Sequence, residues 1–181
     1  ALKVTASGTC GGRQLQVEKE IPITIVPRPL PNRMPVVMWG NGDIERLKAF
    51  GFTHELAGLV NEEMVWKAGQ PGPAMSPSSI EERGRFLDEL LKNGLYACVY
   101  SYPGSWVTRD EARKAQYNRV DRKGEMRSHD NVCGNFPEVR QFCYNVGASI
   151  GQTFGQYPAL DGALIHSEVR DGSDLCFHEH D

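Results

Sequence analysis

The chain contains the stretch Ala163-Leu164-Ile165-His166-Ser167-Glu168-Val169-Arg170-Asp171. Its first three residues are apolar, and polar or charged residues follow directly. A short apolar run of this kind predicts a buried parallel strand whose carboxyl end delivers the polar residues that follow. In barrels built from strand–helix units, residues at this end of the strands perform the chemistry. We therefore predict that Glu168 is a functional carboxylate.

Upstream of this stretch, apolar runs alternate with amphipathic segments. We predict strands at 35–40, 53–58 and 95–102, and helices at 44–50, 79–92 and 137–154. Apolar strands without strict alternation are typical of a parallel sheet covered by helices. The predicted fold class is α/β, with residues 35–181 forming the first half of a (β/α)8 TIM-type barrel. Because a full barrel needs about 250 residues, we expect the remainder of the same polypeptide to complete it.

The first part of the chain has a different pattern. Residues 1–27 contain alternating segments separated by turn formers, which predicts a hairpin. Because two strands alone are marginally stable, we expect this segment to be the end of a β-sandwich domain. A proline-rich linker at 28–34 separates it from the barrel segment. This organisation predicts an excerpt of a larger multidomain protein.

Composition excludes several function classes. Twenty Lys and Arg residues stand against 23 Asp and Glu residues, which gives a formal charge of −3. Nucleic-acid binding proteins usually carry a basic excess, so no nucleic-acid partner is predicted. The sequence contains no apolar run of about 18 residues, so no membrane span is predicted. Neither G-x-G-x-x-G nor a Walker-type loop is present, and no cofactor is therefore predicted.

Three segments resemble motifs of family 42 glycoside hydrolases, the β-galactosidase type. They are Met126 to Arg140, Phe154-Gly155-Gln156-Tyr157-Pro158-Ala159-Leu160, and Ile165-His166-Ser167-Glu168. In the family, the first matches a Cys-Pro-Asn-x-Pro stretch that opens a helix, the second matches Tyr-Gly-x-His-Pro-Ala, and the third matches a strand ending in His-x-Asn-Glu. Trp39 and the segment from Asp43 to Phe52 look like the first strand and helix of such barrels.

The resemblance implies a role for each matched residue. Glu168 corresponds to the general acid/base of a two-carboxylate retaining mechanism that cleaves an oligo- or polysaccharide. The nucleophile belongs to strand seven, which would lie beyond residue 181. Ser167 replaces the family's asparagine, which contacts the sugar 2-hydroxyl. Serine is shorter, so the choice of substrate depends on this position.

Further residues follow the predicted strands and are candidates for binding the sugar. Aromatic planes pack against the C–H faces of sugar rings, and polar groups hydrogen-bond the hydroxyls. The aromatic candidates are Trp39, Tyr102 and Trp106. The polar candidates are Asn41, His166, Ser167 and Arg170. Packing under loops would equally explain the tryptophans, and an ion pair with Arg170 would equally explain Glu168.

Two other functions stay open at this point. A catalytically inactive barrel would bind carbohydrate without cleaving it. A metal-dependent α/β hydrolase would use Cys133, Cys176, His178 and His180, which together form a Cys₂His₂ set. Some family 42 members carry a cysteine-ligated zinc in this region, but a solvated histidine-rich loop explains the pattern as well, and no metal ligand is assigned. The compartment stays open, although a polysaccharide substrate would favour secretion.

Overall fold

The computed structural model describes residues 1–22, 34–40, 42–126, 132–165 and 175–179. Backbone contacts divide the chain into two units, Ala1–Met34 and Pro35–Asp181. The division falls where the sequence changes from an all-β pattern to alternating strands and helices. The sandwich segment at 1–27 and the linker at 28–34 stay predictions, because most of the linker lies outside the described residues.

The first unit is an antiparallel hairpin of β1 (Leu2–Cys10) and β2 (Arg13–Ile21). Its turn contains only Gly11 and Gly12, both with positive φ, which glycine adopts without a steric clash. One face of the hairpin is apolar and exposed, and it carries Leu2, Val4, Leu15, Val17 and Ile21. A second sheet covers such a face in β-sandwiches, so the sandwich stays a reasonable prediction.

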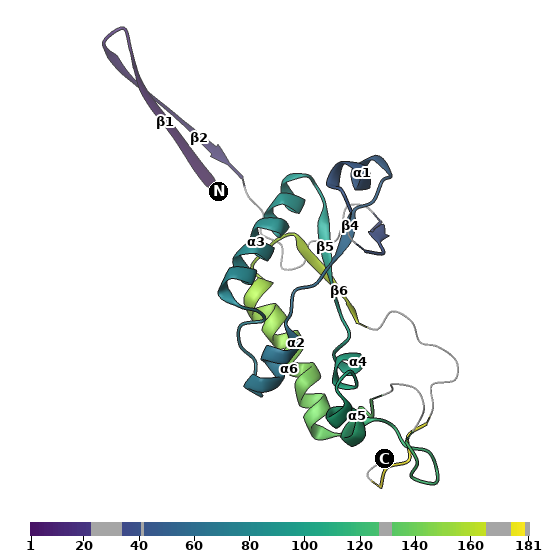
Figure 1. Ribbon diagram of the computed structural model, residues 1–181. Coiled ribbons are helices and arrows are strands. Elements are labelled where there is room, and N and C mark those ends of the chain that lie inside the picture. Colours follow the sequence, from purple (N-terminus) through teal and green to yellow (C-terminus); the bar gives the residue numbers. More distant parts are fainter. Residues whose placement is uncertain (23–33, 41, 127–131, 166–174, 180–181) are drawn as a thin grey trace. The chain divides into compact units, whose positions relative to one another are not determined.

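The second unit alternates strands and helices (Figure 1). Its strands are β3 (Val37–Met38), β4 (His54–Ala57), β5 (Tyr96–Ser101) and β6 (Leu160–Ile165). Its helices are α1 (Ile44–Ala49), α2 (Glu62–Ala68), α3 (Pro77–Lys92), α4 (Pro103–Val107), α5 (Glu111–Tyr117) and α6 (Pro137–Phe154). Within the described residues, none of these helices has the length and apolar character that crossing a membrane requires.

The four strands of this unit form one parallel sheet in the order β3-β4-β5-β6. Each strand pairs with the next along the chain, as repeated strand–helix–strand connections produce. The pairing of β5 with β6 shifts register between Ala97 and Cys98. The parallel α/β sheet predicted from the sequence is confirmed, whereas closure into a barrel stays a prediction.

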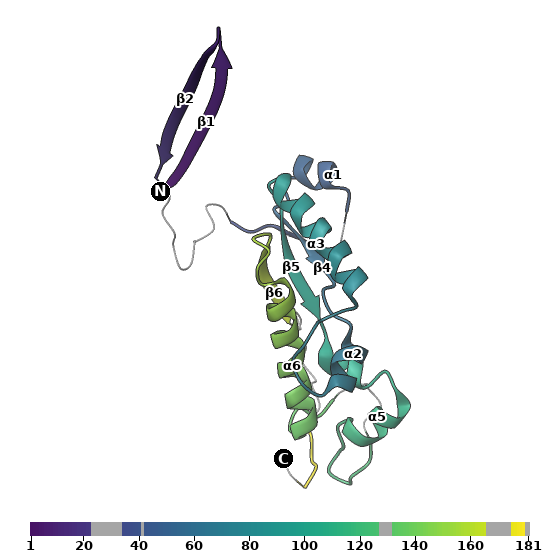
Figure 2. The same ribbon diagram turned by 90° about the vertical axis from the view of Figure 1, so that its left-hand side faces the viewer.

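Helices α3 and α6 pack on one face of the sheet (Figure 2). Side chains alternate along a strand, so every second residue of β5 meets these helices. The layer between sheet and helices contains Leu87, Leu90, Ala97, Val99, Val146 and Ile150. Burying a Leu, Ile or Val side chain contributes about 1.5–3 kcal/mol, so this layer holds the sheet in place.

Four helices differ from the sequence prediction. Helix α3 begins at Pro77, two residues before the predicted start at 79, and Ser76 is its N-cap, because the Ser76 hydroxyl accepts from the Ser79 N–H at 3.3 Å. Helix α2 was not predicted, although Asn61 caps it and a left-handed Gly69 ends it. Helices α4 and α5 were not predicted either. Helices α2, α4 and α5 are too short for hydrophobic periodicity to reveal them.

Helix α3 packs closely against Tyr157 at Gly84, which has no room for a side chain. A Cβ atom at this position would collide with the Tyr157 hydroxyl and lie 2.9 Å from Tyr157 Cζ. We predict that Gly84→Ala destabilises the fold by about 1–3 kcal/mol, although alanine is the better helix former. Gly147→Ala in α6 is the control, because nothing lies within 4 Å of its Cβ, and it should stabilise by about 0.5–1 kcal/mol. Equal shifts in thermal unfolding would contradict the packing.

Candidate functional site

The carboxyl ends of β3, β5 and β6 lie at one edge of the sheet, because all four strands point the same way. Trp39 follows β3, and Tyr102 follows β5. Asn41, His166, Ser167, Glu168 and Arg170 lie outside the described residues, so their roles stay predictions.

Two of the predicted sugar-binding residues, Trp39 and Tyr102, contact the ring of Tyr100. The ring of Trp39 meets Tyr100 edge to face, with centroids 5.2 Å apart. Tyr102 meets the same ring at 4.6 Å, and the two tyrosine hydroxyls are hydrogen-bonded. Trp39 is 58% exposed, which leaves much of its indole accessible. Tyr100 was absent from the predicted site, although its spacing from Tyr102 places both on one side of an extended chain.

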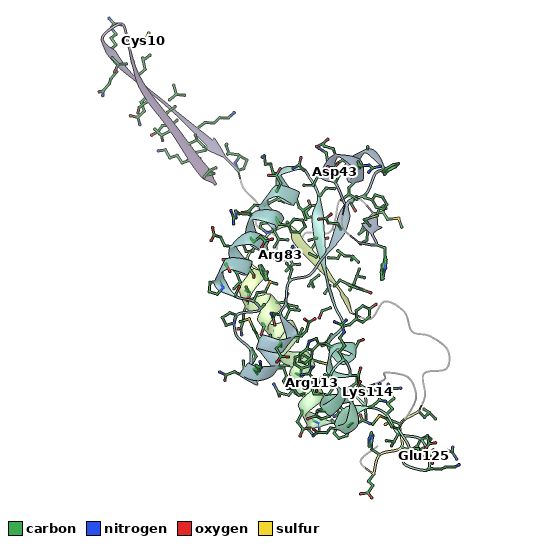
Figure 3. All side chains as sticks on the ribbon, viewed as in Figure 1. Cys10, Asp43, Arg83, Arg113, Lys114 and Glu125 are labelled. Carbon is green, nitrogen blue, oxygen red and sulfur yellow. The ribbon has the colours of Figure 1, made fainter. Side chains whose placement is uncertain are left out.

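Trp106 occupies a different environment in α4. Its ring lies 5.1 Å from Phe142 of α6 and 5.9 Å from Trp66 of α2. The guanidinium of Arg113 lies 3.9 Å from the Trp106 ring centroid, a cation–π contact. Figure 3 labels Arg113 beside Lys114 on α5. None of the ring contacts given by the described residues joins Trp106 to Trp39 or Tyr102. Packing accounts for its position, and its role in substrate binding stays a prediction.

A half-buried set of hydrogen bonds links the strands near their amino ends. His54 Nε2 lies 3.0 Å from Asp161 Oδ2, and His54 Nδ1 lies 2.7 Å from Thr53 Oγ1. A carboxylate only accepts, so Nε2 is the donor to Asp161. The Thr53 hydroxyl also accepts from the Val36 N–H and lies 3.2 Å from Val36 O, so the direction of its bond to Nδ1 depends on the imidazole tautomer. His54 is 4% exposed. These hydrogen bonds connect β4 to β6 across β5. Such a structural role is expected at the amino ends of the strands of a parallel sheet.

Glu55 is a second buried polar residue in β4. Its side chain points to the opposite face from His54, because neighbours in a strand alternate. It is 1% exposed and accepts one backbone hydrogen bond, from the Gly42 N–H at 3.3 Å. Burial raises the pKa of this carboxyl above its ordinary value, and the Gly42 hydrogen bond opposes the rise. The folded chain therefore favours the protonated form of Glu55 more than an unfolded chain does.

Three of the four residues considered for a zinc set lie together. The ligand atoms of Cys133, Cys176 and His178 are within 4.8 Å of one another, and Cys176 Sγ lies 2.9 Å from His178 Nδ1. Backbone hydrogen bonds position the two segments: Cys133 N–H donates to Tyr117 O, and Phe177 N–H donates to Val120 O. Thiolate sulfur and imidazole nitrogen are the ligands of structural zinc sites. These donors fit that metal, whereas His180 lies outside the described residues.

Comparisons with known proteins give a similarity in fold. No protein-family model matches the sequence, and no curated protein matches it significantly. The structure is similar to part of the crystal structure of a cold-adapted β-galactosidase from Rahnella sp. R3, with a TM-score of 0.50 and 17% identity. The match covers 76% of this chain and 19% of the galactosidase, so the chain spans about a fifth of that enzyme's length. The likeness supports the parallel α/β fold.

Glu55 makes the stability of the fold depend on pH. The pKa of Glu55 is raised from 4.5. The stability that its protonated carboxyl contributes is therefore fully present below pH 4.5 and is lost as the pH rises through the pKa of the folded state. We predict that Glu55→Gln, which cannot ionise, is more stable than the wild type at pH 7. The difference should shrink at pH 4. Thermal unfolding at both pH values measures it.

Glu45→Gln is the matched control for this experiment. Glu45 is exposed on α1, and among the described residues its ion pair is with Lys48, at 3.5 Å. Exposed pairs contribute about 0–1 kcal/mol, so this variant should change little at either pH. A Glu55→Gln protein that loses more stability at pH 7 than at pH 4 would show that its surroundings stabilise the carboxylate, and would contradict the raised pKa.

Proposed function

We propose that this chain is part of a glycoside hydrolase that cleaves a glycosidic bond in an oligo- or polysaccharide. One observation carries the proposal: the parallel α/β fold is similar to part of a β-galactosidase, and its fourth strand, β6, leads into Glu168. Residues beyond the carboxyl ends of parallel strands perform catalysis in folds of this type. The rest of the same polypeptide would complete the barrel and the site.

In the proposed mechanism, Glu168 is the general acid/base of a retaining reaction. It first protonates the oxygen of the leaving group, and later removes a proton from the water that attacks the glycosyl-enzyme intermediate. The nucleophile is a second carboxylate about 5–5.5 Å away, and it would lie beyond residue 181. The acid must be protonated at the pH of the reaction. Arg170 is therefore proposed to bind substrate rather than to pair with Glu168.

The sugar would pack against the exposed indole of Trp39. Tyr100 supports that indole, and the Tyr102 hydroxyl lies beside that of Tyr100. Aromatic faces and a few placed polar groups are the usual composition of sugar pockets. Asn41, His166 and Ser167 are the proposed partners of the sugar hydroxyls. The alternative is an inactive barrel that binds the sugar, and the Ser167 replacement is the feature that favours it.

Hydrolysis of nitrophenyl glycosides by the intact protein and its Glu168→Gln variant tests the proposal. We expect the variant to lose about two to four orders of magnitude in activity, because general acid–base catalysis contributes about that much. The variant should still bind the sugar, since the amide preserves the size of the side chain. A panel of glycosides also identifies the preferred sugar.

Two controls accompany that assay. Glu111→Gln changes an exposed carboxylate in the first turn of α5 and should leave the activity unchanged. Trp39→Ala should raise KM more than it lowers kcat, since it removes a binding surface. Activity that survives Glu168→Gln would assign the acid to another residue, and inactivity of the wild type on every glycoside would favour the inactive binding barrel.

We also propose that Cys133, Cys176 and His178 hold a structural zinc ion, with His180 as the candidate fourth ligand. Structural zinc sites use four protein ligands rich in cysteine, whereas catalytic sites keep a position open for water. Residue 133 precedes α6, and residues 176–178 follow the segment that contains Glu168. When bound, the ion would cross-link these two segments, so its role would be to hold the loops near the site.

Metal analysis of the purified protein tests the zinc site. We predict about one zinc per chain, and Cys133→Ser or His178→Ala should reduce this content and lower the unfolding temperature. A chelator should lower the unfolding temperature of the wild type only. Cys10→Ser, which removes an exposed thiol in the hairpin, should retain the metal. A protein without zinc after growth in zinc-supplemented medium would refute the site.

A further inference from the structure

A pocket that is not lined by Trp39, Tyr100 or Tyr102 lies between helices. It has a volume of about 480 Å³ and is bordered by α2, the end of α5 and the first half of α6. Helices α2 and α6 lie side by side in both ribbon views (Figures 1 and 2). Volumes of about 300–1,000 Å³ are typical of sites for small molecules. The pocket therefore has room for a small organic ligand.

Aromatic rings form a fixed wall of this pocket. Trp66 meets Phe142 at 5.0 Å and Tyr117 at 5.9 Å, both edge to face. On α5, Arg113 is held by Glu63 at 3.6 Å, and its guanidinium lies 5.8 Å from the Trp66 ring centroid. Rings restrained on several sides lose little freedom when a ligand packs against them.

Hydrogen-bonding groups of both kinds face the same pocket. Asn145 is 2% exposed, and its Oδ1 accepts from Gln141 Nε2 at 2.8 Å. Among the described residues, none accepts from the Nδ2 of Asn145, which stays available as a donor. Burial first, and the nearby Glu138 second, raise the pKa of Tyr117, which keeps its hydroxyl a donor at neutral pH. Glu138 adds a carboxylate acceptor.

The charges around the pocket select the class of ligand. Glu138 disfavours an anion, and Arg113, already placed over the Trp66 ring, disfavours an organic cation on that ring. A neutral molecule with one apolar face and several hydroxyls matches an aromatic wall with interleaved donors and acceptors. We propose that this pocket is a second sugar-binding site, which takes a monosaccharide or the end unit of an oligosaccharide.

The inference rests on the proposed function only for the choice of a sugar over other neutral polyols. A second site on the helix layer would hold a polymeric substrate near the enzyme without taking part in the reaction. The second site would raise the overall affinity for the polymer through multivalency, because binding at one site raises the effective concentration of the polymer at the other. The sugar it prefers should therefore belong to the substrate that the enzyme hydrolyses.

Calorimetric titration of galactose, glucose and their methyl glycosides into the full-length Glu168→Gln protein tests the site without hydrolysis. We expect two classes of binding, one at the proposed catalytic site and one at the pocket. Only the second weakens, about tenfold, in Gln141→Ala, because losing a hydrogen-bond partner costs about 1.4 kcal/mol. Gln152→Ala removes another exposed glutamine of α6, away from the pocket, and should leave both affinities unchanged. Gln141→Ala also removes the donor to the buried Asn145 Oδ1 and should lower the unfolding temperature, so the titrations are run well below the unfolding temperature of every variant.

The other outcomes separate this site from the catalytic one. Sugar binding that Trp39→Ala abolishes, and that Gln141→Ala leaves intact, would overturn the second site. Binding of tetramethylammonium in place of any sugar, or no binding of any sugar tested, would also overturn it. Hydrolysis by the wild type without pocket binding would refute only this inference. Pocket binding without hydrolysis would support the inference and refute the proposed function.

Discussion

The parallel direction of four strands is the constraint on which the rest of the structure depends. Because each strand pairs with the next along the chain, every connection crosses over through the helix layer. The carboxyl ends of β3, β5 and β6 are consequently on one edge of the sheet. Trp39, Tyr102 and Ile165, the last residue of β6, come from sequence positions more than 50 residues apart, and this geometry alone directs them to the same edge of the sheet.

The two ends of the sheet use polar groups differently. Near the amino ends, His54 of β4 and Asp161 of β6 are hydrogen-bonded across β5, which resists shear of the sheet. On the other face of β4, Glu55 accepts from one backbone N–H among the described residues, and its pKa is raised. Buried polar groups stabilise a fold most when their hydrogen-bond partners are complete. The first arrangement strengthens the sheet, whereas the second disfavours the ionised form of Glu55.

Aromatic residues divide into two groups with different roles. Trp39, Tyr100 and Tyr102 form an exposed group at the strand ends, while Trp66, Trp106, Tyr117 and Phe142 form a group between the helices. The second group joins the short helices α2, α4 and α5, which local sequence signals did not reveal, to α6. It also forms the wall of the pocket beside α6. A carbohydrate enzyme with both surfaces would contact its substrate at two places.

The sequence by itself determined the strands, the two long helices and their order. Helix α6 was predicted with both of its ends, and the parallel sheet followed from apolar runs between amphipathic helices. Periodicity of this kind depends on neighbours along the chain, so it can be read from residues alone. Only the tertiary structure decided that Tyr100 joins Trp39, that Trp106 packs among the helices, and that Cys133 meets Cys176 and His178. Those contacts join residues far apart in sequence, and their distances depend on how the helices pack against the sheet.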